Sequence, residues 1–410
     1  MNCRLNLRDS AQMHEFYRSQ LLEDCVPFWM KHSLDHEYGG YLTMLDRDGT
    51  PYGTGKYVWP QARQAYLLAK LYNTVERKSD WLEASRLGVE FLSKHALDEN
   101  GRAYCKLARD GTPLYSRPGE IFAESFVILA LAEYAKASGK EEYLHRAEKL
   151  FWDVIKRLQS GELDEQSNVK TPLYKEHAPG MIMINTTQEL RAARDDPRYS
   201  ELIHDWVQEE LYVHARDEQK AMFERVGLDG VPILTEPEGR SITPGHCLES
   251  CWFCLEEGLH HKNTEIVQRA CQIMDWAMKL GWDEVYGGIF NFVDYEGKPP
   301  GHHDEDWGED QDWDAKLFWV HSEALYALLL AYRTSGEEKF MDWYEKVHYW
   351  AFKYFPDPKY GEWFGYLRRD GSVSQNLKGC IKGFFHLPRA LLKCMLLSGR
   401  RVRGSRILEK

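Results

Sequence analysis

Apolar and polar positions along the chain alternate between two kinds of helical pattern. The segment from Ile121 to Tyr134 is apolar on almost every side, which is typical of a helix that is covered all round. In the next segment Glu141, Arg146 and Lys149 leave one face polar, which indicates a helix with one exposed side. The alternation recurs and predicts twelve helices, over residues 11–32, 59–76, 79–96, 118–138, 140–159, 178–194, 197–214, 245–261, 263–280, 315–335, 337–354 and 383–397.

A short motif separates the helix pairs and returns about every sixty residues. It starts with a glycine turn, as at 38–41 (YGGY), and ends with an Asp-Gly or Glu-Gly turn, as at 46–49 (DRDG). Two such turns around a short aromatic strand predict a small β-hairpin. Further copies begin near residues 100, 286 and 360, and weaker ones lie near Leu163-Asp164 and Leu228-Asp229-Gly230.

Six hairpins and six helix pairs predict a repeat architecture in which each pair buries one face against its neighbours. We therefore expect an all-α protein, an (α/α)6 barrel with short β-hairpins at one mouth. The helix at 383–397 should pack beside the helix at 11–32 and close the ring. Because no Pro/Gly/Ser-rich linker interrupts the repeat, we expect one catalytic domain over residues 1–398. The basic tail 399–410 lacks apolar periodicity and is expected to be disordered.

Bulk composition narrows the class of protein. The chain has 410 residues, of which 43% are hydrophobic, which is enough for a large core. Its net charge is −12 and no basic stripe is present, so nucleic acid is not an expected partner. No apolar run has the length of a membrane span or of a signal peptide. Nine cysteines in such a chain indicate reduced thiols and a cytoplasmic location.

Polar residues recur near the starts of the six predicted inner helices. In a ring of this kind the inner helices run parallel, so their N-terminal ends meet at one mouth. One polar residue there would mean little, whereas six sets in matching places are hard to explain by packing. These residues are Trp59, Gln61, Arg63, Glu124, Asn185, His246, Glu249, His321, Glu323, His386 and Arg389.

Each of these residues also has a purely structural interpretation. A histidine among apolar neighbours is often a hydrogen-bonded core residue. His246, however, follows Pro244-Gly245, which marks a helix start rather than a core position. Burial of Arg63 or Arg389 would be costly without an anionic or polyhydroxyl partner, because a guanidinium keeps its charge. Glu249 lies on the same helix face as His246 and could orient its imidazole or only form a local hydrogen bond.

Metal and cofactor sites are not predicted. The spacing of His246 and Glu249 occurs in di-iron bundles, which need a second such motif and two more glutamates, and these are missing. Cys247, Cys251 and Cys254 have helical spacing and are interpreted as core thiols. No phosphate-binding or dinucleotide-binding glycine motif is found. His302-His303 and the acidic run 304–312 are expected in a solvated or lid-like loop. Acid/base chemistry without a cofactor remains.

Several stretches of the chain resemble the N-acylglucosamine 2-epimerase family. The family is an (α/α)6 barrel that interconverts N-acetylglucosamine and N-acetylmannosamine without a redox cofactor. The resemblance implies a homodimer and ATP or another nucleotide as an effector that is not consumed. It covers nearly the whole chain and rests on residues 28–33 (FWMKHS), 56–59 (KYVW), 244–246 (PGH), 316–321 (KLFWVH), 360–366 (YGEWFGY) and 382–389 (KGFFHLPR).

The resemblance also implies roles for individual residues. His246 and His386 match the two acid/base histidines of the family, and Arg63, Glu249, Glu323 and Arg389 fall at substrate-contacting positions. The further candidates for sugar contacts are Tyr57, Trp59, Glu124, Asn185 and His321. The chain departs from the family pattern at Pro60 and Ala62, at 177–181 (HAPGM) and in the length of the acidic run, which bears on the choice of sugar.

The expected mechanism removes the proton at C2 of the ring-opened sugar and returns it to the other face. Two imidazoles suit this reaction because they accept and donate protons near neutral pH. Arg63 or Arg389 would stabilise the enediolate, and Glu249 would hold His246 in one tautomer. Three alternatives stay open: an isomerase or 2-epimerase of an unacetylated sugar (mannose, glucose or cellobiose type), a glycoside hydrolase that uses Glu124, Glu249 and Glu323, and a protein-binding role of the renin-binding kind.

Overall fold

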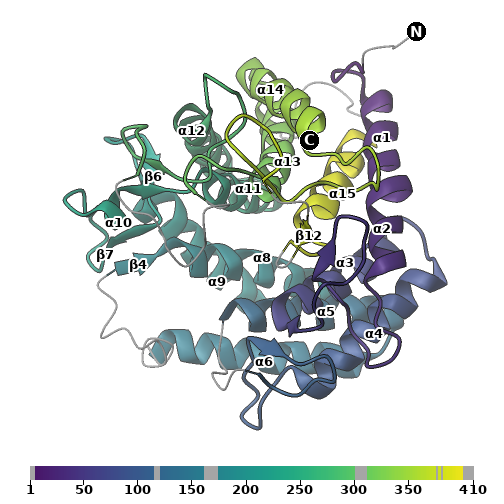
Figure 1. Ribbon diagram of the computed structural model, residues 1–410. Helices are drawn as coiled ribbons and strands as arrows, with labels where there is room; N and C mark the ends of the chain where they lie inside the picture. The colour runs from purple at the N-terminus through teal and green to yellow at the C-terminus, as the bar shows by residue number, and fades with distance from the viewer. Residues whose placement is uncertain are drawn as a thin grey trace.

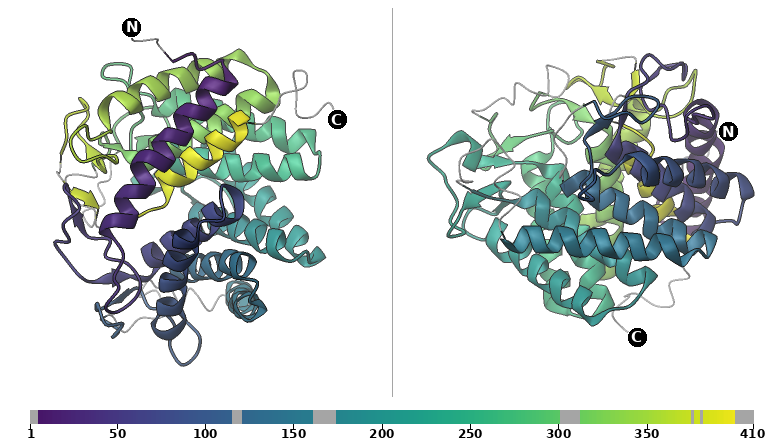
Figure 2. Two further views of the ribbon diagram at one scale, coloured as in Figure 1. Left: turned by 90° about the vertical axis from the view of Figure 1, so that its right-hand side faces the viewer. Right: turned by 90° about the horizontal axis from the view of Figure 1, so that it is seen from below.

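The computed structural model describes residues 5–114, 121–160, 174–300, 312–374, 377–379 and 382–399, and its helices form a ring of two layers (Figures 1 and 2). Consecutive inner helices pack against one another, and each inner helix packs against an outer one. The ring closes where Tyr66 of the first inner helix contacts Phe385, directly before the last one. The inner helices are α3 (Val58–Thr74), α5 (Ile121–Ser138), α8 (His177–Ala193), α11 (Pro244–His260), α13 (Phe318–Ser335) and α15 (His386–Gly399).

The outer helices carry the half-exposed pattern that the sequence predicts. Two of them contain a π-helical segment. In the first, η1 (Gln20–Cys25) ends directly before Val26-Pro27, and proline has no N–H for the regular helical ladder. The outer layer comprises α1 (Ser10–Ser19), η1, α2 (Val26–His32), α4 (Ser79–His95), α6 (Glu141–Ser160), α9 (Pro197–Gln208), η2 (Glu209–His214), α12 (Thr264–Gly281) and α14 (Glu338–Tyr354); the short α10 (Pro237–Arg240) lies in a loop.

The predicted (α/α)6 fold class is confirmed, and all twelve predicted helices are present. The apolar segment of α5 is buried from Ala123 to Ala135. Helix α1 lies beside α15 (Figure 2, left), and His14 Nδ1 bonds to the Met395 carbonyl at 2.9 Å. Two predicted starts are three residues too early. Lys316–Leu317 forms a strand, and Gly383 has a φ of 56°, which a right-handed helix does not allow.

The predicted hairpins are only partly right. Isolated bridges such as Leu34 to Tyr41 form within the motif, but the described two-stranded sheets, apart from one local hairpin at 215–222, join neighbouring units. The strand before an inner helix pairs with the loop that follows the next outer helix, so the strands and the N-terminal ends of the inner helices share one mouth. The antiparallel pairs are β1 (Leu45–Asp46) with β12 (Leu377–Gly379), β2 (Lys56–Tyr57) with β3 (Lys106–Leu107), β4 (Tyr174–Glu176) with β7 (Arg225–Gly227), β8 (Ser241–Ile242) with β9 (Val293–Asp294), β10 (Lys316–Leu317) with β11 (Tyr366–Leu367), and the local hairpin β5 (Ala215–Arg216) with β6 (Ala221–Met222).

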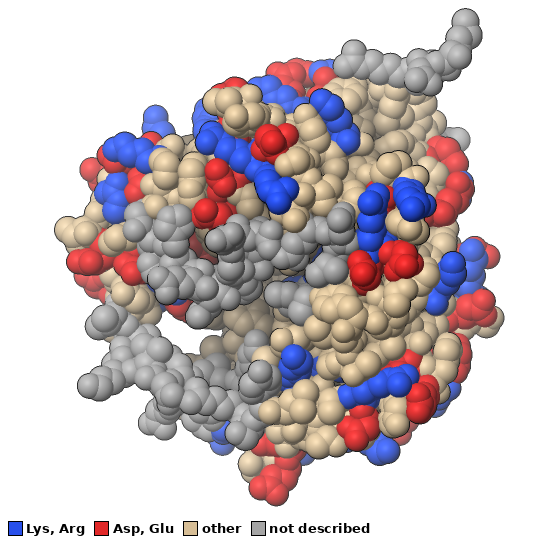
Figure 3. Space-filling view, in the orientation of Figure 1, with Lys and Arg blue, Asp and Glu red and all other residues tan. Residues whose placement is uncertain are grey.

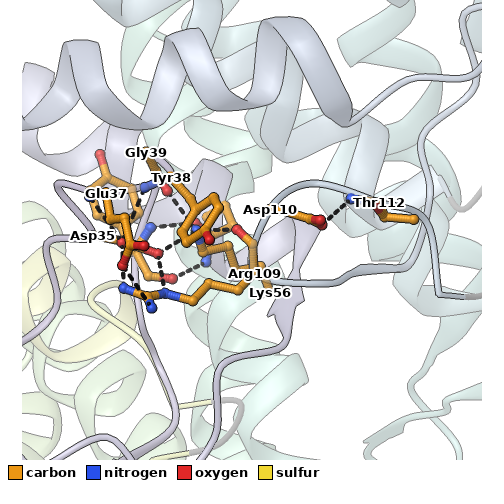
Figure 4. A network of polar contacts seen from close by, with 10 residues as sticks. Asp35, Glu37, Tyr38, Gly39, Lys56, Arg109, Asp110 and Thr112 are labelled. Carbon is orange, nitrogen blue, oxygen red and sulfur yellow. Dashed lines mark hydrogen bonds and ion pairs between the residues drawn. The ribbon is translucent and has the colours of Figure 1, made fainter.

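A buried ion cluster ties neighbouring units together (Figure 4). Asp35 bonds to Lys56 Nζ at 2.9 Å and to Arg109 Nε at 2.9 Å, and both Asp35 and Lys56 are inaccessible to solvent. Arg109 also covers the ring of Tyr38. The same set recurs twice around the ring, as Asp283 with Lys316 and Arg369 and as Asp357 with Lys378 and Arg47. The sequence repeat therefore corresponds to a repeated ion cluster of one Asp, one Lys and one Arg between neighbouring units. We call each such cluster a clasp.

Several predictions concern residues outside the described ranges. These are the hairpin near Leu163-Asp164, His302-His303, the acidic run up to residue 311 and the tail from residue 400. None of the helices in the described part of the chain has the length and apolar character of a membrane span. Figure 3 shows the molecule in the orientation of Figure 1. Among the described residues on this face, acidic and basic side chains are interspersed, and a hollow opens near the middle of the molecule.

Candidate active site

Three inner helices bring two histidines to one tryptophan. His246 lies in the first turn of α11, His386 is the first residue of α15, and Trp319 is the second residue of α13. The indole ring centroid of Trp319 is 5.2 Å from the His246 ring and 5.6 Å from the His386 ring. The parallel arrangement of the inner helices thus places both predicted acid/base histidines beside one aromatic surface.

A carboxylate that the sequence did not reveal binds His246. The Nδ1 atom of His246 is 3.1 Å from Oε2 of Glu224, which lies between β6 and β7. Burial alone would raise the pKa of Glu224, but the nearby His246 and His177 outweigh it and hold that pKa well below its usual value. An ionised Glu224 accepts a hydrogen bond from Nδ1–H, so that whenever the His246 ring is neutral its Nε2 carries the lone pair.

The prediction that Glu249 orients His246 is wrong. Glu249 forms an ion pair with Arg389 of α15 instead. The i, i+3 spacing put both side chains on one face of α11, but the buried guanidinium of Arg389 attracts the carboxylate. Arg389 also donates to Oε1 of Glu323 at 2.7 Å, so one cation is shared by two carboxylates.

His386 is held in a similar way to His246, in a drier environment. Its Nδ1 is 2.7 Å from Oε1 of Glu323, whose other oxygen accepts a bond of 2.8 Å from Trp252 Nε1. Burial, followed by the positive charge of Arg63, holds the pKa of His386 well below its usual value. His386 is therefore neutral near pH 7, with a proton on Nδ1 and a lone pair on Nε2.

Arg63 is a cation without a carboxylate partner among the described residues. Its guanidinium lies over three aromatic rings, at 4.4 Å from Trp59, 4.1 Å from Phe126 and 4.6 Å from Phe385. Its Nε is buried and has no hydrogen-bond partner in the described part of the chain. Burial lowers the pKa of Arg63 to about 9, against the opposing field of Glu249. The arrangement leaves donors for an oxygen-rich ligand.

Other predicted site residues have structural contacts. Both ring nitrogens of His321 are engaged, by the Leu317 carbonyl at 2.8 Å and by the Ile289 N–H at 3.0 Å, and its ring stacks on Trp350. Burial lowers the pKa of His321 to about 3. Such a histidine has no ring nitrogen left for a ligand.

The remaining candidates differ in what they contact. Glu124 is buried and paired with Arg157 at 2.7 Å. Tyr57, at the end of β2, accepts a bond of 3.3 Å from Lys106. Asn185 is almost fully buried on α8, and Trp59 lies beneath Arg63.

Comparison with known proteins decides the family. The profile of the N-acylglucosamine 2-epimerase (GlcNAc 2-epimerase) family matches residues 39–390. N-acylglucosamine 2-epimerase of Rattus norvegicus is 34% identical over 405 residues, which cover 96% of this chain and 93% of the relative.

The chain belongs to the N-acylglucosamine 2-epimerase family. It is thereby an enzyme of the carbohydrate epimerase class, and the prediction of the family is confirmed. Solved structures support the fold. A D-mannose isomerase superposes with a TM-score of 0.81 at 18% identity, with coverage of 93% of this chain and 97% of that one. A cellobiose 2-epimerase from Bacillus thermoamylovorans gives 0.81 at 20% identity, with coverage of 94% and 99%.

Two groups of side chains in this family member have the composition of a metal site. They are His177 with Glu224 and His246, and Glu249 with Glu323 and His386, and within each group the possible ligand atoms lie within 4.8 Å of one another. In the second group Arg389 already forms an ion pair with each carboxylate. In the first, the carboxylate of Glu224 lies between two imidazoles. Since ion pairs within the protein account for both groups, we assign no metal ligand to them.

Sequence reasoning missed Glu224 and the aromatic surroundings of Arg63. Glu224 lies two residues after the end of β6 and directly before β7, with no periodic pattern or turn motif to mark it. Phe126 and Phe385 had the apolar character of core residues, and only the ring geometry brings them to a guanidinium. The short motifs that resemble the family contain His246, Trp319 and His386, because each of these residues lies at a recognisable helix start.

Proposed function

We propose that this enzyme interconverts N-acetylglucosamine and N-acetylmannosamine by moving the proton at C2. The observation that carries the proposal is the pair of imidazoles beside Trp319, each held through Nδ1 by a glutamate. Inversion at one carbon needs an acid and a base on either face, and this pair offers Nε2 atoms for both roles. The choice of N-acetylated sugars follows the names of the curated relatives.

The chemistry requires the open form of the sugar, in which an aldehyde at C1 makes the C2 proton removable. Nε2 of one histidine takes this proton, and the electron pair of the broken C2–H bond forms the enediolate. The second imidazole, protonated, then donates a proton to the other face of C2. The deprotonated and protonated histidines exchange roles in the reverse direction, so that no net proton is gained or lost. We assign the role of neutral base in the resting enzyme to His386, whose pKa is held low by burial.

Arg63 is the better of the two candidate arginines for the enediolate oxygen. Arg389 is committed to Glu249 and Glu323, whereas Arg63 contacts aromatic rings and no described carboxylate. A guanidinium that is not neutralised gives the larger stabilisation of a developing negative charge. We assign Arg389 the task of holding Glu249 and Glu323, and through Glu323 it fixes the ring of His386.

The same contacts weigh against a glycoside hydrolase. That chemistry needs two carboxylates that face the scissile bond, one of them free to act as an acid. Glu249 and Glu323 share Arg389, and Glu124 is paired with the buried Arg157. Each of the three glutamates is thus already held by a buried arginine. A histidine pair is also more than a binding scaffold requires, so we rank a renin-binding kind of role below catalysis.

Deuterium incorporation tests the proposal. The protein is incubated with N-acetylmannosamine in deuterated water, with and without ATP, and C2 is followed by proton NMR. We expect N-acetylglucosamine with deuterium at C2, and faster turnover with ATP if a nucleotide acts as an effector. Product without deuterium would contradict proton transfer at C2.

Two further substrates separate the neighbouring activities. Turnover of mannose, glucose or cellobiose in place of the acetylated sugar would assign an unacetylated substrate, and fructose formed from mannose would assign an aldose–ketose isomerase. Loss of turnover in both His246→Asn and His386→Asn, with an unchanged circular dichroism spectrum, is expected. High activity of either variant would contradict the two-histidine mechanism. A cytoplasmic location and a homodimer stay predictions.

A further inference from the structure

A second histidine lies behind the carboxylate of Glu224. His177 is the first residue of α8 and is completely buried. Its Nε2 is 2.6 Å from Oε2 of Glu210 and 2.6 Å from Oγ of Ser250. Its Nδ1 faces Oε1 of Glu224 at 3.5 Å.

These contacts join four side chains into one row. Glu210 contacts His177, which faces Glu224, which in turn binds His246. Glu210 comes from the π-helical segment η2, a type of segment that often occurs at functional sites. Acid and imidazole alternate along the row, so each carboxylate has a ring nitrogen as its neighbour. The row ends at the ring that contacts Trp319.

The charge state of His177 follows from this position. Burial alone would lower the pKa of His177, but Glu210 and Glu224 outweigh it and raise that pKa to about 10. The other titratable ring beside it is His214 of η2, at 5.5 Å, whose pKa is lowered by burial. His177 is thus a cation near pH 7, while His214 is neutral.

We propose that His177 is a positioning residue for His246, a fixed cation that balances the charge of Glu224 and so allows His246 to release its proton as well as bind it. This inference rests on the proposed function, in which His246 must do both. An ionised Glu224 beside His246 stabilises the imidazolium form. A second cation on the far side of the same carboxylate weakens that stabilisation.

The proton of His177 takes no part in the transfer. It stays between His177 and Glu210 throughout the reaction, while the proton that moves passes between Nε2 of His246 and C2 of the sugar. Glu210 has the task of keeping the charge on His177, and Ser250 bridges the two. Neither Glu210 nor His177 has to move, which suits two residues at 0% exposure.

The charge on His177 can be observed directly in the intact wild-type protein. Histidine rings labelled with ¹⁵N are followed by NMR at about pH 8.5, two units above the ordinary histidine pKa. We expect one ring with both nitrogens protonated at this pH, and its signal should be absent from His177→Gln. A wild-type spectrum in which all histidine rings are neutral at pH 8.5 would overturn the proposal, and this measurement needs no variant.

Kinetics test the effect on His246. We compare the pH profiles of kcat and kcat/KM for wild type, His177→Gln and the control His348→Gln, which replaces an equally buried histidine that contacts Tyr17 on the outer layer. Without the cation at 177, His246 should bind its proton more firmly. The limb of the pH profile that reports His246 should then move to higher pH by about one unit. We expect a fall in kcat of about tenfold and little change in KM.

The control and a second variant make the outcome specific. His348→Gln should leave the profile in place, and a similar shift there would show a general effect of buried substitutions and overturn the proposal. Glu210→Gln removes the carboxylate that keeps the charge on His177, so the doubly protonated ring should be lost from its ¹⁵N spectrum at pH 8.5. If wild type shows no epimerisation, the proposed function fails, while the ¹⁵N spectrum still decides the charge of His177.

Discussion

Glu224 binds Nδ1 of His246 at 3.1 Å, although 22 residues separate the two in the chain. The bond connects the loop between β6 and β7 to the first turn of α11. It engages Nδ1 of His246, which leaves Nε2 for the substrate in the proposed reaction, and no local sequence pattern predicts it.

Replacement of Glu224 by Gln should remove most of the activity. A glutamine amide that donates to Nδ1 favours the opposite tautomer, in which Nε2 carries a proton and cannot accept one. We expect kcat to fall on the order of a hundredfold or more, with a small change in KM. Steady-state epimerisation assays would measure it. Glu218→Gln, at an exposed position of the β5–β6 turn, is the matched control and should behave as wild type.

Arg63→Lys should separate charge from shape. Lysine keeps a positive charge but loses the planar guanidinium that lies over Phe126 and Phe385. We expect kcat to fall on the order of a hundredfold, and deuterium uptake at C2 to fall with it, because the enediolate loses its donors. If uptake at C2 continued at the wild-type rate while product formation fell, Arg63 would act after proton removal and not on the enediolate.

His321→Gln should affect stability rather than chemistry. Its two ring nitrogens hold the Leu317 carbonyl and the Ile289 N–H, and both bonds are buried. Loss of one buried bond costs about 1–3 kcal/mol of unfolding free energy. Urea denaturation should show this loss, while kcat/KM of the folded variant stays within about threefold of wild type. A large rise in KM with unchanged stability would instead indicate that His321 contacts the substrate.

The clasp of Asp35 should be a major contributor to the stability of the ring. Asp35→Asn leaves Lys56 charged and buried without its carboxylate, and breaking a buried pair from one side costs about 3–5 kcal/mol. Thermal unfolding would report the loss. Asp48→Asn, at an exposed turn of the same unit, keeps its side-chain acceptor and should cost less than about 1 kcal/mol. Equal losses in the two variants would contradict a special role for the clasp.

The equivalent clasp of Asp283 gives a dependence on pH. Burial alone would raise the pKa of Asp283, but Arg369 and Lys316 outweigh it and lower it to about 2, from an ordinary value of 3.8. A lowered pKa stabilises the folded state at pH values above 3.8, and this contribution is lost as the pH falls through 2. Wild type should therefore lose unfolding free energy between about pH 4 and pH 2 more steeply than Asp283→Asn. Parallel curves for the two proteins would count against this assignment.

Much of the fold could be predicted because helical periodicity is local. The all-round apolar pattern of α5 and the one-sided pattern of α6 (Glu141–Ser160) can each be recognised within one segment, and the recurrence of such pairs implies a ring. Strand pairing was predicted less well. A Gly-Gly turn suggests a partner nearby in the chain, whereas Lys56–Tyr57 pairs with Lys106–Leu107 in the next unit.

The sequence by itself determined the helix pairs, the family and the two histidines at helix starts, because these depend on spacing within short segments. Only the tertiary structure decided how charges are shared at the site. Glu249 and Glu323 pair with Arg389, Glu224 binds His246, and Nε of Arg63 has no hydrogen-bond partner among the residues that the structure describes. In a buried site each ion pairs with the nearest compensating charge in space, and the order of residues in the chain does not give that distance.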